Sequence, residues 1–286
     1  MHTRLREILE HTVKLLEDDP RILGCWLSGS AGGVSEDEFS DVDPIFLVRD
    51  EDFDQVDNDL PGLFRSACPN VILWWPEITN SDIVKNYAIL IDGDPLVQYD
   101  VNILRASAFS PGWLAGCEPG QILFDKTGVL RAALPRASYP PYTPDRLLLS
   151  IQRFWLYVYI NVKYLKRGDL FKLLFVQRVL FETHLEILRA LRPQANWGWW
   201  PLAVKCVLGR DRQSAMLRYF GAVDRDSILR AVDAETEMFA QDAREACRRH
   251  GVEYPDALEA RIRDYVQANR PGVRPADSSF GRPKKP

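Results

Sequence analysis

The fold of this chain is decided by the stretch LSGSAGGVSEDEFSDVDPIFLV (Leu27–Val48). Small residues at Gly29 and Ser30 follow one apolar run, and Asp41 and Asp43 stand at the head of a second. Side chains two residues apart on a strand point to the same face, so the two carboxylates share one face and the residue between them points into the core. The stretch therefore predicts two buried strands, joined by a turn and an acidic loop, with paired acids on one side.

Apolar patterns on both sides of this stretch extend it into a mixed α/β unit. Residues 5–16 have helical spacing, which predicts an amphipathic helix at the start of the chain. Asp92–Pro95 is a tight-turn sequence between two apolar runs and predicts a β-hairpin. Further strands are predicted at 71–75, 86–91, 96–104 and 121–128.

The second half of the chain has a different character. Four prolines within 134–144 indicate a linker. Two long helical patterns then meet at Gly168, and more helical segments follow, which is typical of a helical bundle. We predict an α+β protein with a mixed β-sheet flanked by helices (1–134), a Pro-rich linker (135–144), a C-terminal all-α bundle (145–268) and a disordered tail (269–286).

The charge balance excludes some functions. Lys and Arg number 36 against 40 Asp and Glu, a net charge of −4, whereas nucleic-acid binding depends on clustered basic residues. From Glu36 to Asp59 there are eleven acidic residues and one basic residue, Arg49. Most of these acids predict a solvated face or loop. The alternative is a negative mouth that attracts a metal or a polycationic small molecule.

Cysteine, histidine and apolar runs indicate the cellular setting. The five cysteines are odd in number and lack CxxC spacing, which favours free thiols in a reducing cytosol. Four scattered histidines argue against a histidine-based zinc site. No apolar run is long enough to cross a bilayer, and the N-terminus is not a signal peptide. We expect a cytoplasmic protein that does not bind membranes, and its oligomeric state stays open.

The aspartates suggest a metal site. Adjacent carboxylates repel, and a divalent cation such as Mg²⁺ relieves that repulsion. Asp100 is a third acid in an otherwise apolar strand, so three acids would form a platform for one or two metal ions that assist displacement at phosphorus. The Gly29–Ser30 turn would let backbone N–H groups and a hydroxyl approach a phosphate. The alternative is a set of buried acids with local partners.

In this order and spacing the motifs resemble the DNA polymerase beta-like nucleotidyltransferase superfamily. More closely, the sequence is similar to the aminoglycoside 6-adenylyltransferases (streptomycin adenylyltransferases). The similarity covers roughly residues 1–200. It is carried by DEFSDVDPIFLV (37–48), DGDPLVQYDVNIL (92–104), QILFDKTGVL (121–130) and FWLYVYINVKYLKRGDL (154–170).

The resemblance implies a nucleotidyltransferase catalytic domain joined to a helical domain. It implies transfer of AMP from ATP, with Mg²⁺ as cofactor, to a hydroxyl of a cationic aminoglycoside such as streptomycin, with release of pyrophosphate and antibiotic resistance as the result. Asp100 would be a metal ligand or the general base, with Glu77 as the alternative base. The implied residues are Asp41, Asp43 and Asp100 for catalysis and metal binding, and Gly29, Ser30 and Lys163 for nucleotide binding.

Two residues differ from the family pattern. Ala31 stands where the family usually carries an arginine, so Lys163 or Arg49 would have to assist triphosphate binding. Pro44 removes a hydrogen-bond donor from the strand that carries Asp43. These differences keep two alternatives open. One is a nucleotidyltransferase that acts on another antibiotic, a metabolite or a protein, and the other is a catalytically degenerate homologue that binds nucleotide.

Some other residues have weaker signals. His184 lies in a helical pattern rich in Leu and Phe, which predicts a partnered structural histidine. Trp74 and Trp75, like the cluster of Trp197, Trp199 and Trp200, are predicted to pack in a core or interface. Stacking on an adenine or a sugar ring is the alternative for these tryptophans.

Overall fold

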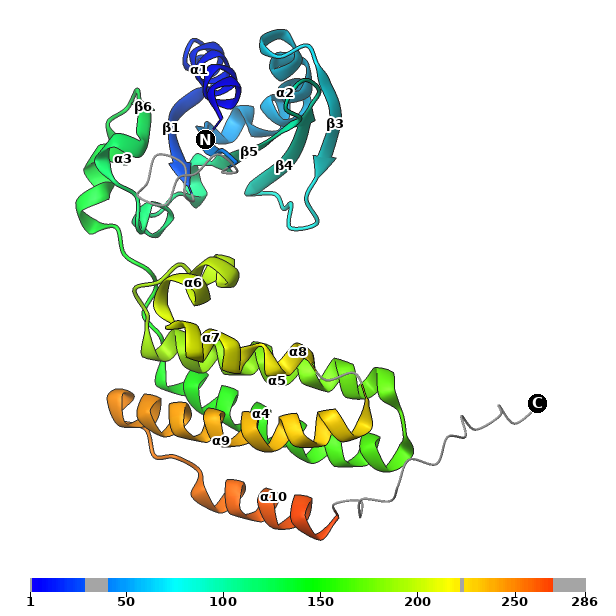
Figure 1. Cartoon of the computed structure of the whole chain (residues 1–286). Coiled ribbons are helices and arrows are strands. Elements are labelled where there is room, and N and C mark those ends of the chain that lie inside the picture. The colour runs from blue at the N-terminus through cyan, green and yellow to red at the C-terminus, as the bar shows by residue number, and fades with distance from the viewer. Residues whose placement is uncertain (1, 29–40, 222–223, 270–286) are drawn as a thin grey trace. The chain divides into compact units, whose positions relative to one another are not determined.

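The computed structural model describes residues 2–28, 41–221 and 224–269 (Figure 1). It consists of two compact units, Met1–Tyr139 and Pro140–Pro286. The division falls within the segment 135–144 for which a linker is predicted. Apart from Asn269, the predicted tail lies outside the described residues. The α+β class is confirmed, because the first unit contains a mixed sheet and the second is helical.

The first unit is built on a six-stranded sheet in the order β3-β4-β5-β2-β1-β6. β2 and β5 run parallel, and the other neighbouring strands are antiparallel. The predicted hairpin is confirmed as β4 and β5. The strands are β1 (Ile22–Ser28), β2 (Asp43–Val48), β3 (Val71–Pro76), β4 (Val84–Ile91), β5 (Val97–Arg105) and β6 (Ile122–Asp125).

Two helices, α1 (Thr3–Glu17) and α2 (Phe53–Ala67), cover one face of this sheet (Figure 1). The first confirms the predicted amphipathic helix, and its Arg4 guanidinium donates to the carbonyl of Pro95 at 2.6 Å, which ties the helix to the β4–β5 turn. The second helix is missing from the sequence prediction. Its acidic residues resemble a solvated loop, but Phe53 begins a set of apolar residues at helical spacing that bury one side of the helix.

The opposite face of the sheet, called the second face below, is covered only in part. Over β1, β2 and β6 it carries an apolar cluster that includes Trp26 and Leu47 and is closed by Leu130 of the short helix α3 (Val129–Ala133). Toward β3 the second face is exposed, and Trp75 is 53% accessible. The polar residues described below lie between these two regions.

The second unit is a helical bundle. Its long helices α4 (Pro144–Arg167), α5 (Leu170–Leu191) and α9 (Arg225–His250) lie side by side (Figure 1). Phe154 and Phe239 stack in their core with ring centroids 3.5 Å apart. Gly168 and Gly251, with φ of +66° and +64°, end α4 and α9 in the left-handed conformation that glycine tolerates. The shorter helices are α6 (Trp200–Val207), α7 (Arg210–Met216), α8 (Arg218–Gly221) and α10 (Asp256–Ala268).

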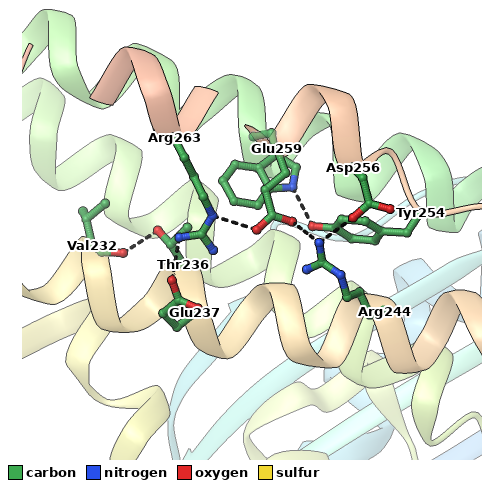
Figure 2. Close-up of polar contacts among 9 residues, drawn as sticks. Val232, Thr236, Glu237, Arg244, Tyr254, Asp256, Glu259 and Arg263 are labelled. Carbon is green, nitrogen blue, oxygen red and sulfur yellow. Dashed lines mark hydrogen bonds and ion pairs between the residues drawn. The ribbon is translucent and has the colours of Figure 1, made fainter. Parts of the chain in front are cut away.

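Charged residues hold α10 against α9, as Figure 2 shows. The carboxylate of Glu259 is almost fully buried and forms ion pairs with Arg244 at 2.9 Å and Arg263 at 2.7 Å. Arg244 also reaches Asp256 at 2.6 Å, and its guanidinium lies 4.1 Å from the ring centroid of Tyr254. Glu259 is therefore the shared counter-charge of Arg244 and Arg263, and its removal would break both ion pairs.

Two further sequence predictions concern the cysteines and membranes. All five cysteines are free thiols, as the sequence predicts. None of the helices in the described ranges is both long and apolar enough to cross a bilayer.

The ion pairs of α10 give a stability prediction. Replacing Glu259 with Ala should lower the free energy of unfolding by about 3 kcal/mol, because two arginines lose a buried counter-charge. Asp256→Ala is the control, since it removes an exposed partner of the same Arg244 and should cost about 1 kcal/mol or less. Urea unfolding followed by far-UV circular dichroism measures both. Equal losses would contradict the role given to Glu259.

Candidate functional site

The parallel register of β2 and β5 places two acids side by side. Ile45 lies opposite Asn102, so two residues earlier Asp43 lies opposite Asp100. The backbone confirms this extension, because the N–H of Asp100 donates to the carbonyl of Val42 at 3.0 Å. Partners in a sheet project to the same side, and the carboxylates of Asp43 and Asp100 therefore meet on the second face.

Asp41 completes a group of three. The prediction that it lies on the strand is wrong, since β2 begins at Asp43. The alternation still holds, because Val42 between the two acids is fully buried. Ligand atoms of Asp41, Asp43 and Asp100 all lie within 4.8 Å of one another, and all three residues are half-buried.

This proximity changes the electrostatics of the site. Burial raises the pKa of Asp43 to about 8, and the charges of Asp41 and Asp100 add to the effect. Burial also raises the pKa of Asp100 to about 6, opposed by a hydrogen bond from Gln98 and assisted by the charges of Asp41 and Glu77. The folded chain therefore disfavours full ionisation of the group, and a cation would relieve the repulsion.

Two polar residues beside Asp100 were not singled out in the sequence. The amide nitrogen of Gln98 donates to both carboxylate oxygens of Asp100, at 2.9 and 3.1 Å, and so orients the acid. Asn102 lies two residues further along the same face. The signal was present, because Gln98, Asp100 and Asn102 alternate with the buried Tyr99 and Val101.

Asn102 also explains how the sheet accommodates Pro44. In this parallel register the N–H of residue 44 would donate to the carbonyl of Asp100, and proline has no N–H. The side-chain amide of Asn102 lies 3.4 Å from that carbonyl and 3.3 Å from the carbonyl of Pro44, so it donates in place of the missing group. Asp43 consequently keeps its position opposite Asp100.

Strand β1 ends beside the acids. Ser28, the last residue of β1, pairs with Asp43, and its hydroxyl donates to the Asp43 carbonyl at 3.3 Å. Gly29, Ser30 and Ala31 lie outside the described residues. Their role in phosphate binding stays a prediction, although the strand that precedes them ends beside the acids.

The other charged candidates lie in different places. Glu77 is exposed just after β3, and its charge contributes to the raised pKa of Asp100. Arg49 follows the far end of β2, about 20 Å along the strand from Asp43, so the interpretation that it assists triphosphate binding beside the acids is wrong. Lys163 is exposed on α4, with its amine 4.7 Å from the ring centroid of Tyr159.

His184 is structural, as predicted. Its side chain is fully buried and its ring nitrogens bond to the hydroxyl of Tyr219 at 2.8 Å and the carboxylate of Asp242 at 2.7 Å. Burial lowers the pKa of His184 and so favours the neutral ring, whereas the hydrogen bond and the charge of Asp242 act in the opposite direction.

The tryptophans differ in how far they are packed. The Trp74 ring packs 5.8 Å from that of Phe64 and 5.0 Å from that of Tyr87, as predicted for a core residue. Trp75 points to the second face and is exposed, so core packing is the wrong interpretation for this residue. In the helical unit Trp200 meets Phe181 edge-on at 4.9 Å.

The three acids fit a hard divalent cation. They supply only oxygen ligands, which suit Mg²⁺, and their spacing lets one ion contact all three. Within the described part of the chain, no lysine, arginine or histidine forms an ion pair with them.

Comparison of the sequence with protein families shows which family it belongs to. Residues 1–269 match the family described as streptomycin adenylyltransferase. The chain belongs to this family. As a streptomycin adenylyltransferase family member it is a nucleotidyltransferase, an enzyme of the aminoglycoside adenylyltransferase kind. No curated protein matches the sequence.

Two solved structures are similar to this family member. One is an aminoglycoside 6-adenyltransferase from Bacillus subtilis, with 15% identity, coverage of 93% of this chain and 97% of that chain, and a TM-score of 0.42. The other is a nucleotidyltransferase-like protein from Exiguobacterium sibiricum, with 10% identity, coverage of 86% and 77%, and a TM-score of 0.36.

The acidic group predicts a pH dependence of stability without metal. The unfolded chain releases the Asp43 proton near the ordinary pKa, whereas the folded chain holds it up to about pH 8, so stability falls as pH rises between these values. In the presence of EDTA, Asp43→Asn should therefore raise the free energy of unfolding at pH 8, by about 1–3 kcal/mol, and much less at pH 5.

Denaturant unfolding at the two pH values measures this effect. Asp92→Asn, in the exposed β4–β5 turn, is the control and should give no such pH-dependent gain. A gain for Asp43→Asn that is equal at both pH values would show that repulsion within the group is not its cause.

Proposed function

We propose that this enzyme transfers AMP from ATP to a hydroxyl of a cationic aminoglycoside, such as streptomycin, and so confers resistance to the drug. The observation that carries the proposal is the group Asp41, Asp43 and Asp100, with ligand atoms within 4.8 Å, in a chain of this family. Nucleotidyl transfer needs metal-binding acids beside a phosphate-binding turn, and Ser28 leads into the predicted turn beside Asp43.

The residues divide the work by position. Asp41 and Asp43 would hold Mg²⁺, with Asp100 as a further ligand or as the base. When bound, the metal would neutralise phosphate charge and stabilise the leaving pyrophosphate. Gly29 and Ser30 would hold the triphosphate, and their chain segment starts where β1 ends.

The proton of the acceptor hydroxyl also needs a place to go. As the hydroxyl oxygen bonds to the α-phosphorus, the bond to pyrophosphate breaks and the proton passes to a carboxylate. Asp100 suits this role because Gln98 fixes its orientation and its pKa of about 6 makes it a competent base near neutral pH. Glu77 is exposed and remains the second choice for the base.

The proposal also assigns tasks to the two parts of the chain. Residues 1–134 would carry the chemistry, and the helical domain 145–268 would contribute Lys163 to nucleotide binding. The reaction is placed in the cytoplasm, where ATP is abundant and the five thiols stay reduced.

A pyrophosphate-release assay tests the proposed reaction. Purified enzyme with ATP and Mg²⁺ should release pyrophosphate only when an aminoglycoside with a free hydroxyl is added. Asp41→Asn should lower the rate at least about 100-fold, because one ligand of the phosphate-neutralising metal is lost. Asp92→Asn should retain the activity. Failure of every aminoglycoside in a broad panel, including streptomycin, would refute the acceptor class.

The role of Lys163 is tested separately. Lys163→Met should raise the KM for ATP about tenfold and leave the KM for the aminoglycoside within about twofold, because only a phosphate contact is removed. Lys166→Met is a matched control, an exposed lysine on the same helix whose amine bonds to Asn269. Equal effects of the two changes would mean that Lys163 is an ordinary surface lysine.

A further inference from the structure

A row of side chains crosses five strands of the sheet at the level of the acids. Ser28 of β1 pairs with Asp43 of β2, and the parallel register places Asp43 opposite Asp100 of β5. Asp100 in turn pairs with Ala88 of β4, and Ala88 pairs with Trp75 of β3. Directly paired residues project to the same side, so all five belong to the second face.

The side chains of this row differ in size at its β3 end. Ala88 carries only a methyl group, between the carboxylate of Asp100 and the indole of Trp75. Neighbouring strands lie about 4.8 Å apart, so the Trp75 and Asp100 backbones are separated by about 10 Å. A six-membered ring resting on Ala88 would have the indole on one side and the acid on the other.

Trp75 is far more exposed than its neighbour on the same strand, Trp74. Trp74, next to it, packs among the rings of Phe64 and Tyr87, whereas 53% of Trp75 is accessible. Leu73, two residues earlier on the same face, is 41% exposed and extends the apolar surface. An uncovered indole beside acids suits a ligand that has both an apolar ring face and a positive charge.

The acids near Trp75 fit the same ligand. Glu77 lies two residues after Trp75 on the same face and is exposed, and its N–H donates to the carbonyl of Asn86 at 3.0 Å, which continues the pairing beyond β3. An ammonium or guanidinium group beside the indole would meet this carboxylate. Asn86, the partner of Glu77, pairs in turn with Asn102 of β5, so Glu77 and Asp100 project to the same face of the sheet.

The order of the row identifies which substrate occupies this end. β1 ends at Ser28 beside Asp43, so under the proposed function, in which Gly29 and Ser30 hold the triphosphate, the triphosphate would bind on that side. Trp75 lies on the other side, beyond Asp100. A ring on Ala88 is therefore next to the proposed base, where the attacking hydroxyl must be.

We propose that Trp75, Ala88 and Glu77 form the acceptor subsite, in which a cationic aminocyclitol or amino-sugar ring stacks on Trp75 and directs a hydroxyl toward Asp100. Trp75 and Glu77 are then specificity-determining residues. The inference rests on the proposed function, since it places the acceptor of that same reaction.

Binding and turnover of Trp75 variants test the subsite. Trp75→Ala should weaken binding of the reactive aminoglycoside about tenfold in calorimetric titration and raise its KM to a similar extent. The KM for ATP should stay within about twofold. Trp75→Phe should recover most of the affinity, because it restores an aromatic face. Glu77→Gln should weaken the binding of cationic ligands and leave the KM for ATP unchanged.

A change on the same strand provides the matched control. Ile72 is 61% exposed and lies in the bulge of β3 between Val71 and Leu73, where it pairs with no residue of β4, so Ile72→Ala removes exposed apolar surface from β3 without changing a member of the row. Its affinity for the aminoglycoside should equal that of the unchanged enzyme. Circular dichroism and thermal unfolding confirm that each variant is folded.

The outcomes separate this inference from the proposed function. If the unchanged enzyme binds aminoglycosides through Trp75 but releases no pyrophosphate, the reaction is refuted and the subsite stands. If pyrophosphate is released and Trp75→Ala leaves the aminoglycoside affinity and KM unchanged, the subsite is refuted and the reaction stands. A rise in the KM for ATP instead would assign Trp75 to adenine and overturn the inference, as would the absence of any aminoglycoside binding.

Discussion

The parallel pairing of β2 with β5 is the constraint on which the site depends. These strands are far apart in the sequence, and their register alone sets Asp43 opposite Asp100. The arrangement is unfavourable in itself, because two half-buried carboxylates of the same charge are held together. The apolar residues on the covered face offset this cost, with Phe46 and Ile103 paired in the core beneath α1 and α2. The site is thus an electrostatically unfavourable part of a well-packed sheet.

Strand β5 carries residues for stability on one face and polar residues for chemistry on the other. Tyr99, Val101 and Ile103 point toward the helices and are fully buried, whereas the residues between them are polar and point to the second face. Substitutions of the polar residues of β5 on the second face should therefore alter function with limited effect on folding. The two neighbouring tryptophans differ in the same way. Trp75 is exposed beside the acids and indicates a binding role, whereas Trp74 packs among the rings of the core and contributes to stability.

Local compensation makes Pro44 compatible with an interior strand. The missing backbone donor faces the carbonyl of Asp100, and the Asn102 side chain occupies the position from which a donor is needed. Two departures from an ordinary strand, a proline and a polar residue, thus support each other across neighbouring strands. Read separately in the sequence, each of them counts against a buried strand.

The sequence by itself determined the local elements and the kind of chemistry. Apolar runs around Asp43 and Asp100 and the turn at Asp92–Pro95 were sufficient for the strands and the hairpin, because these signals depend on near neighbours. The acidic residues of α2 concealed its helical spacing. Only the tertiary structure decided that Asp100 faces Asp43, that Asn102 serves Pro44, and that Trp75 belongs to the same row. Strand register results from many contacts between distant segments, and no local pattern contains it.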